Sequence, residues 1–198
     1  LDLLRELKID QNTLVMIAGD NGSSFDPKSE VGSLFNQASN GLRGYKRGLY
    51  EGALRQAALS WWPGKVPAGK TIDQPAYHAD IMPTLCALAG VDAGQPYGDN
   101  LLPIWTGGAD TLATRKPMVW CGGGYGGQAA VRIGGMKAIR RELFSANPTP
   151  WEVYDLTNDR AETRDLATTR GDFIARAVDL LKTEYKPAAG YKELNFLA

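Results

Sequence analysis

The sequence predicts an α/β fold followed by a small C-terminal α+β part, which contains an antiparallel sheet and a terminal helix. Three observations predict this architecture. A helical pattern near the start leads through a short turn into a continuous apolar run, four short strand-like runs follow in the second half, and an amphipathic helical pattern comes last. We expect residues 1–110 to form one domain and residues 111–198 a second.

The first helix and strand follow from the spacing and type of residues. Leucines recur at helical spacing within residues 3–7, and residues 13–18 form a run of β-prone apolar residues. Such a run is typical of a strand buried on both faces of a parallel sheet, so we expect that environment here. The strand ends at Asp20 and Asn21, whose side chains would stand at the carboxyl end of the sheet, where ligands bind in open α/β folds.

A second strand and a helix complete the first part. Residues 57–62 are strand-like and are closed by a Pro-Gly turn. We expect Asp80 to cap a helix over residues 81–89, which Gly90 ends. His78 immediately precedes this helix, and we interpret it as a capping or core residue rather than as an acid–base group.

Short strands dominate the second part and predict an antiparallel meander. The strand-like runs lie at residues 117–121, 129–133, 137–141 and 151–156. Glycines or Asn-Pro turns separate them. Asp172 is expected to cap a final helix, whose apolar residues between 173 and 185 fall on one face.

Composition and charge limit the classes of function. The 22 Lys and Arg residues balance the 22 Asp and Glu residues, so the chain lacks the bulk positive charge of a nucleic-acid-binding protein. No apolar run approaches the roughly 20 residues of a membrane span, and residues 1–6 lack the basic region of a signal peptide. Because the chain has one histidine and two cysteines, a Cys/His zinc site is excluded.

A glycine-rich run at residues 122–127, Gly-Gly-Gly-Tyr-Gly-Gly, fits the glycine spacing of a dinucleotide-binding loop. That function requires a helix immediately afterwards, because the helix N-terminus holds the pyrophosphate. A strand-like run follows instead, at residues 129–133. We therefore interpret residues 122–127 as a hairpin connection.

Asp20 and Asn21 are candidate metal ligands. A carboxylate and an amide carbonyl are hard oxygen donors, which suit Ca²⁺ or Mg²⁺ rather than Zn²⁺. The same Asp-Asn-Gly run also fits a turn or a helix cap that binds no ligand. Because Ca²⁺ takes roughly 6–8 oxygens, a complete site would need donors from elsewhere in the protein.

Residues 41–48, Gly-Leu-Arg-Gly-Tyr-Lys-Arg-Gly, form a cationic segment between glycines. Glycines let the backbone approach a ligand closely, and a lysine such as Lys46 is a point charge that can hold an anionic oxygen. A solvated basic loop is the alternative interpretation of this segment. The residue types alone do not decide between an anion-binding segment and a solvated basic loop.

In order and spacing, these segments resemble the C-terminal part of a type I, formylglycine-dependent sulfatase of the alkaline-phosphatase-like superfamily. The resemblance is to arylsulfatase and N-acetylgalactosamine-6-sulfatase sequences and extends over most of residues 1–167. The segments that carry it are residues 13–22, 41–46, 50–55, 62–65, 80–85, 128–132 and 151–159, followed by Glu162. The resemblance implies a partial alkaline-phosphatase-like α/β sheet, sulfuric ester hydrolase activity for a full-length parent, and a periplasmic or secreted location.

The resemblance also implies roles for three residues. Asp20 and Asn21 would be two ligands of an active-site Ca²⁺, favoured over Mg²⁺, and Lys46 would contact the sulfate ester. In such enzymes the nucleophile is a hydrated formylglycine made within a Cys/Ser-x-Pro-x-Arg motif, which this sequence does not contain. We therefore expect the nucleophile in a missing N-terminal part of the same protein, and no turnover from this chain alone. The other expected partner is a sulfated small molecule or glycan.

Two other functions stay open. A phosphodiesterase or phosphonate hydrolase of the same superfamily shares the Asp-Asn metal pair, and the nucleophile that separates them from sulfatases lies outside the matched segments. The second open function is a non-catalytic glycan-binding module, in which Trp61, Trp62 and Trp105 would stack on sugars. An aromatic core is the competing use of these tryptophans.

Overall fold

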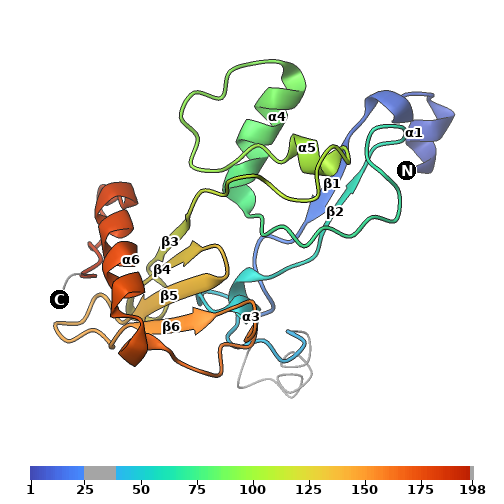
Figure 1. Cartoon of the computed structure of the whole chain (residues 1–198). Helices are drawn as coiled ribbons and strands as arrows, with labels where there is room; N and C mark the ends of the chain where they lie inside the picture. The colour runs from blue at the N-terminus through green and yellow to red at the C-terminus, as the bar shows by residue number, and fades with distance from the viewer. Residues whose placement is uncertain (25–38, 197–198) are drawn as a thin grey trace. The chain divides into compact units, whose positions relative to one another are not determined.

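The computed structural model describes residues 1–24 and 39–196, and Figure 1 shows their elements. They form two compact units, each discontinuous along the chain. The first unit consists of Leu1–Gly19 and Ala57–Lys116, and the second unit consists of Asp20–Gln56 and Pro117–Ala198. Residues 20–56 therefore share a unit with the C-terminal sheet. The division into domains after residue 110 stays a prediction.

The first unit combines a small sheet with short helices. Strand β1 (Val15–Ala18) pairs antiparallel with β2 (Ala58–Trp61). The helices are α1 (Asp2–Glu6), α4 (Ile81–Ala89) and α5 (Leu102–Trp105). The predicted leading helix is thus confirmed as α1, but none of its residues is buried.

The environment predicted for the first strand is wrong in the part of the chain that the structure describes. There β1 has β2 as its one neighbour, the pairing is antiparallel rather than parallel, and Ile17 is 62% exposed. An apolar run shows that a strand favours apolar contacts. The layers that would cover it are not encoded in the strand itself, so its composition cannot guarantee burial.

The helix α4 lies where the sequence predicts, and Gly90 ends it in the left-handed conformation. Asp80 occupies the position before the helix, but its side chain makes no cap hydrogen bond to α4. The carboxylate instead accepts a hydrogen bond from the backbone N–H of Tyr77 at 2.9 Å, because a 3₁₀ turn over His78–Asp80 precedes the helix. His78 was expected to be a capping or core residue. It is exposed, which excludes the core, and the cap positions belong to Tyr77 for the turn and Asp80 for α4.

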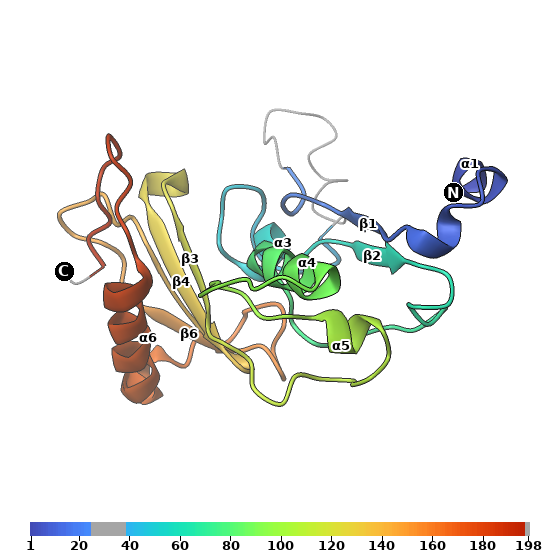
Figure 2. The ribbon, with the colours of Figure 1, turned by 90° about the horizontal axis from the view of Figure 1, so that it is seen from above.

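The second unit is built around the predicted antiparallel meander, which is confirmed (Figure 1). Its strands, in sheet order, are β3 (Met118–Gly122), β4 (Gln128–Ile133), β5 (Met136–Arg141) and β6 (Glu152–Asp155). Helix α6 (Gly171–Glu184) packs on β3, β4 and β5. Figure 2 shows helix α6 beside this sheet. Asp172 lies in the first turn of α6 and pairs with Arg170, so it does not cap the helix as expected.

Both faces of the four-stranded sheet are covered by apolar side chains. On one face, Ala129 and Val131 of β4 join a cluster with the apolar side of α6. On the other face, Ala130 joins a cluster with Leu49 and Tyr50, which lead into the short helix α3 (Glu51–Leu54). The alternation follows from the two-residue period of a strand. The sheet therefore holds residues 49–54 in place through its own core.

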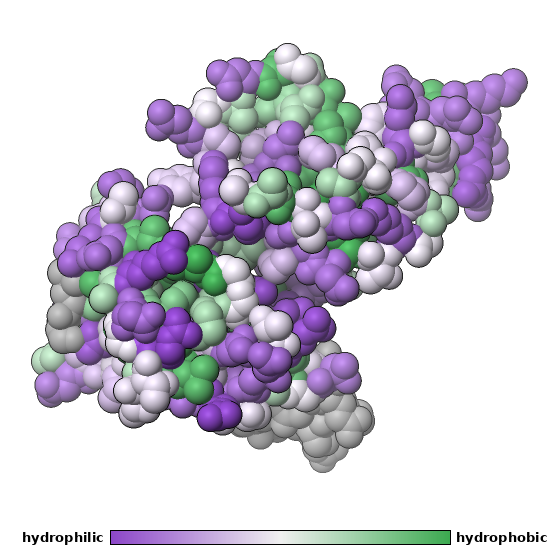
Figure 3. Space-filling model, viewed as in Figure 1, coloured by the Kyte–Doolittle hydropathy of each residue, from purple (hydrophilic) through white to green (hydrophobic). Residues whose placement is uncertain are grey.

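The face that Figure 3 shows is mainly hydrophilic, with apolar patches between polar side chains. One patch lies on α4, where Met82 is 50% and Leu85 is 41% exposed. Within residues 1–24 and 39–196, no helix has the length and apolar character that crossing a membrane requires.

Candidate functional site

Asp20 and Asn21 lie in a bend shortly after β1 and belong to the second unit. Asp20 is exposed and Asn21 is half-buried, so a dissolved ion can reach the bend. In the described ranges, no three or more His, Cys, Asp and Glu side chains gather into a metal-binding group. The donor chemistry of the pair fits Ca²⁺ as two hard oxygen ligands out of the roughly 6–8 that the ion takes.

Residues 41–48, the Lys46 loop, run beside residues 20–22, the Asp20 bend. The backbone N–H of Lys46 donates a hydrogen bond to the carbonyl of Ser23 at 2.8 Å, and that of Gly22 donates to the carbonyl of Ala53 at 2.7 Å. The structure thus brings the backbone of Lys46 next to the segment that contains Asp20 and Asn21. Lys46 itself is exposed. The roles assigned to the three residues stay predictions.

Gly22 has a packing reason to be glycine. A Cβ atom built there would lie 2.2 Å from the carbonyl oxygen of Gly52 and 2.7 Å from the carbonyl carbon of Ala53. Both of these atoms belong to the backbone, which cannot move aside without disturbing α3. The Asp-Asn-Gly run is therefore constrained by close packing as well as by its turn chemistry.

A polar cluster fastens the start of the Lys46 loop to the sheet. Arg43 donates hydrogen bonds to the hydroxyl of Tyr154 at 2.6 Å and to a carboxylate oxygen of Glu152 at 3.2 Å. The hydroxyl of Tyr50 also donates to Glu152, at 2.8 Å and 2.9 Å. Burial alone would raise the pKa of Glu152, but the hydrogen bonds from Tyr154 and Tyr50 and the charges of Arg43 and Arg141 together lower it.

A buried ionic cluster fastens α3 to β5. The ammonium of Lys137, which is fully buried, lies 3.0 Å from a carboxylate oxygen of Glu51 and 2.9 Å from one of Glu162. Glu162 also accepts the backbone N–H of Glu51 at 2.7 Å, and Arg55 donates to Glu51 at 2.7 Å. Burial raises the pKa of Glu162 despite the Lys137 charge, whereas in Glu51 the Lys137 charge and further donors outweigh burial and lower the pKa.

Reasoning from residue patterns missed these two clusters. Lys137 stands at the start of a strand-like run, where a lysine is normally taken for an exposed residue. The family resemblance picked out the segments that hold most members of these clusters, residues 41–46, 50–55 and 151–159 and Glu162, without showing which of them are partners.

Two other features singled out in the sequence are the tryptophans and the glycine-rich run. Trp61, Trp62 and Trp105 are half-buried in the first unit. The indole N–H of Trp62 donates to the carbonyl of Gln11 at 2.8 Å, and the guanidinium of Arg5 lies 5.6 Å from the ring centre of Trp61. Of the run at residues 122–127, Gly122 ends β3 and residues 123–127 connect β3 to β4. The two strands pair antiparallel, so the predicted hairpin is confirmed.

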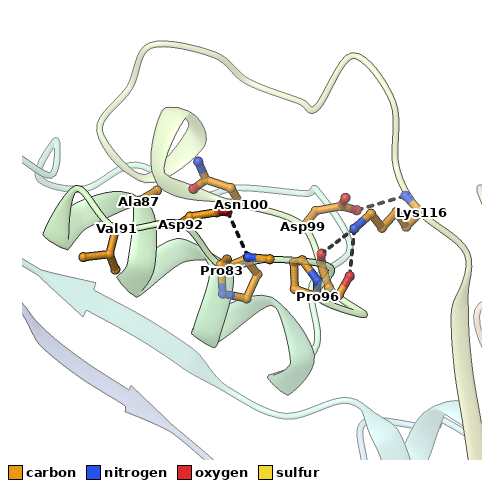
Figure 4. Close-up of a pocket in the computed structure, with 11 residues that line it drawn as sticks. Pro83, Ala87, Val91, Asp92, Pro96, Asp99, Asn100 and Lys116 are labelled. Carbon is orange, nitrogen blue, oxygen red and sulfur yellow. Dashed lines mark hydrogen bonds between the residues drawn. The ribbon is translucent and has the colours of Figure 1, made fainter.

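A shallow pocket of about 280 Å³ lies within the first unit, between the end of α4 and Lys116 (Figure 4). Lys116 and Asp99 of its lining are already engaged. The ammonium of Lys116 donates to the carbonyls of Pro96 and Gly98 at 2.9 Å and 3.1 Å, and Asp99 accepts the backbone N–H of Lys116 at 2.9 Å. Asp20, Asn21 and Lys46 are not among its lining residues.

Comparison with known proteins identifies the family. The family model named Sulfatase matches residues 1–91. The N-acetylgalactosamine-6-sulfatase of the dog, Canis lupus familiaris, is 34% identical over 145 residues, which cover 70% of this chain and 25% of that protein. This chain belongs to the sulfatase family. The steryl-sulfatase of Homo sapiens is 31% identical over 110 residues, covering 54% of the chain and 19% of that protein. This sulfatase-family chain thus spans a quarter or less of these relatives.

Solved structures agree on the fold of this sulfatase-family chain. A protein of glycosaminoglycan metabolism from Bacteroides thetaiotaomicron matches with a TM-score of 0.75 and 21% identity, covering 92% of the chain and 40% of that protein. A protein in complex with its substrate, D-glucosamine-2-N,6-O-disulfate, matches with a TM-score of 0.67 and 20% identity, covering 92% and 35%. The phosphonate monoester hydrolase of Agrobacterium radiobacter matches with a TM-score of 0.59 and 19% identity, covering 92% and 36%. The predicted fold class, a partial alkaline-phosphatase-like α/β part with an antiparallel C-terminal subdomain, is confirmed.

Proposed function

We propose that this chain supplies part of the active site of a sulfate-ester hydrolase. In this proposal Asp20 and Asn21 bind a divalent cation, Ca²⁺ in preference to Mg²⁺, and Lys46 binds the sulfate group of the substrate. Membership of the sulfatase family supports the reaction class. The observation that carries the assignment of residues is the backbone hydrogen bond from Lys46 to Ser23, which keeps the lysine loop beside the Asp20 bend.

The chemistry of the three residues suits a sulfate ester. Hydrolysis by attack at sulfur moves negative charge onto the leaving oxygen and leaves the sulfate oxygens strongly charged. The Lys46 ammonium would bind one of these oxygens and oppose that charge. Asp20 and Asn21 would orient a cation, which when bound neutralises sulfate oxygens as a Lewis acid. The polar clusters at Arg43 and Lys137 would keep the Lys46 loop in place between turnovers.

The proposed substrate is a sulfated small molecule or glycan. The matched relatives are named for different substrates, a sulfated sugar and a steryl sulfate, at similar identity to this chain. A structural neighbour was solved with a disulfated glucosamine as its substrate. The likeness to a phosphonate monoester hydrolase concerns the fold alone, so it does not favour that activity.

Calcium titration of the chain tests the metal ligands. We expect Ca²⁺ to shift the backbone amide NMR signals around residues 20–22 in the unmodified chain, and we expect Asp20→Ala to abolish these shifts. Asp179→Ala, which removes an exposed carboxylate of the same unit, is the matched control and should bind as the unmodified chain does. Equal calcium responses from the Asp20→Ala variant and the unmodified chain would refute the assignment.

A turnover assay tests the expected division of the site. The sequence lacks a Cys/Ser-x-Pro-x-Arg motif, so we expect the chain alone to release no 4-nitrophenol from 4-nitrophenyl sulfate, with or without Ca²⁺. Hydrolysis above the buffer rate that disappears in Lys46→Ala would show that a nucleophile is present in the chain and would overturn this part of the proposal.

A further inference from the structure

Two exposed tyrosines of the second unit lie at the Lys46 loop. Tyr45 belongs to this loop, and Tyr125 contacts it from the connection between β3 and β4. Tyr45 is 36% and Tyr125 is 51% exposed. Their ring centres lie 5.9 Å apart, and the rings are perpendicular, at 90°. The hydroxyl of Tyr125 donates a hydrogen bond to the backbone carbonyl of Lys46 at 3.1 Å. The aromatic pair is therefore attached directly to the residue proposed to bind sulfate.

The surrounding backbone fixes this pair. Arg47, with φ 76°, and Tyr125, with φ 47° and ψ 48°, both adopt left-handed conformations that non-glycine residues rarely hold. Gly124 packs so closely that a Cβ atom there would lie 2.4 Å from the carbonyl oxygen of Arg47. The buried side-chain amide of Gln128 donates to the carbonyls of Arg47 and Gly124, at 3.0 Å and 2.9 Å.

These contacts point to a preorganised surface. Strained backbone persists where its surroundings impose it, and such residues concentrate at ligand-binding and active sites. Rings that are fixed before a ligand arrives lose little conformational freedom when it binds. Both rings keep part of their surface open to solvent, so a ligand can reach them.

We propose that Tyr45 and Tyr125 form a subsite for the sugar ring of a sulfated pyranose whose sulfate binds at Lys46. This inference rests on the proposed function and narrows its substrate class. Two perpendicular rings with hydroxyl groups offer an apolar face together with polar edges, as a sugar ring does with its C–H face and hydroxyl rim. The exposed Arg47 makes the border of this surface charged, which suits a polar ring better than a steroid.

Binding of two probes to the chain separates the subsite from the sulfate contact. The first probe is N-acetylgalactosamine 6-sulfate and the second is inorganic sulfate, each titrated in the presence of Ca²⁺ and followed by backbone amide NMR. We expect the sugar sulfate to bind with a dissociation constant of about 1–10 mM, as befits a few contacts. Tyr45→Ala and Tyr125→Ala should each weaken it about three- to tenfold, while the affinity for inorganic sulfate changes less than about twofold.

Three further variants control the measurement. Tyr45→Phe keeps the ring and should retain the affinity for the sugar sulfate. Tyr191→Ala removes an 80% exposed tyrosine elsewhere in the same unit and should change neither affinity. Lys46→Ala should weaken both probes. The dispersion of each amide spectrum reports whether the variant is folded.

The outcomes distinguish the subsite from the proposed function. The subsite is overturned if folded Tyr45→Ala and Tyr125→Ala bind the sugar sulfate as the unmodified chain does, if they lose both probes in equal proportion, or if the unmodified chain binds no sugar sulfate at about 50 mM. If Lys46→Ala leaves both affinities unchanged while the tyrosine variants still weaken the sugar sulfate, the subsite stands and the proposed sulfate contact fails.

Discussion

The two units of the chain cover their sheets to very different extents. In the second unit, the β4 residues Ala129, Ala130 and Val131 are completely buried between α6 and residues 49–54. In the first unit, the paired β1 and β2 residues Ile17 and Leu59 are 62% and 66% exposed. Ile17 and Leu59 are at least as apolar as these β4 residues, so residue type does not explain the difference. The layers packed on each sheet do, and we therefore expect the second unit to respond most strongly to substitution.

The largest loss of stability is expected from Lys137→Met. The substitution leaves the buried carboxylates of Glu51 and Glu162 without their shared cation, and such a loss typically costs about 3–5 kcal/mol of unfolding free energy. Urea unfolding monitored by circular dichroism measures it. Lys182→Met removes an exposed lysine that pairs with Asp179, and should change the unfolding free energy by less than about 0.5 kcal/mol. A loss below about 1 kcal/mol for Lys137→Met would contradict the role of the ionic cluster.

Leu181→Ala and Leu59→Ala sharpen the comparison between the units. Leu181 is fully buried in the α6 cluster, so truncation should cost about 2–5 kcal/mol. Leu59 is mostly exposed on β2, so the same truncation should cost less than about 0.5 kcal/mol. Urea unfolding measures the loss of unfolding free energy in both variants. Equal losses would show that β1 and β2 are covered in solution.

Gly22→Ala tests the close approach between the Asp20 bend and α3. The new methyl group would meet the backbone at Gly52 and Ala53, and we expect the resulting shift to cost about 1–3 kcal/mol. Gly171→Ala is the matched control, because nothing lies within 4 Å of a Cβ atom at that first residue of α6. The control should be neutral or slightly stabilising in the same unfolding assay. A neutral Gly22→Ala would mean that the bend does not pack against α3.

The smallest effect concerns acid stability and Glu152. Because the fold lowers the pKa of Glu152 from its ordinary 4.5, its carboxylate stabilises the fold above that value, and this contribution is lost as the pH falls through the folded pKa. The fold raises the pKa of Glu162, so Glu162 acts in the opposite direction. Its protonated form stabilises the fold, and this stabilisation is lost as the pH rises through the folded pKa. The difference in unfolding free energy between the unmodified chain and Glu152→Gln should therefore shrink from about pH 6 to about pH 3. A difference that is constant over this range would contradict the assignment.

Local patterns predicted the elements better than their partners. The strands of the second unit are found within a residue or two of their predicted positions, because alternation and turn residues are encoded within each run. The grouping of residues 20–56 with the C-terminal sheet was not predictable in this way. It depends on contacts such as that between Lys137 and Glu51, which are 86 positions apart and leave no periodic trace in the sequence.

The candidate site shows the same limit. Asp20, Asn21 and Lys46 were singled out by residue type and by the family resemblance, but neither required Lys46 to hydrogen-bond to Ser23. The tyrosine pair gave no signal at all, because Tyr45 and Tyr125 belong to two glycine-rich loops that are far apart along the chain. Only the folded structure brings these loops into contact.

Linkage between calcium and sulfate tests the central claim most directly, since that claim places the cation and the anion in one site. Calorimetric titration of sodium sulfate into the chain, with and without saturating Ca²⁺, should show that the cation tightens sulfate binding by about fivefold or more. The gain should vanish in both Asp20→Asn and Lys46→Met. Sulfate affinity that is the same with and without Ca²⁺, or a gain that survives either substitution, would contradict the account.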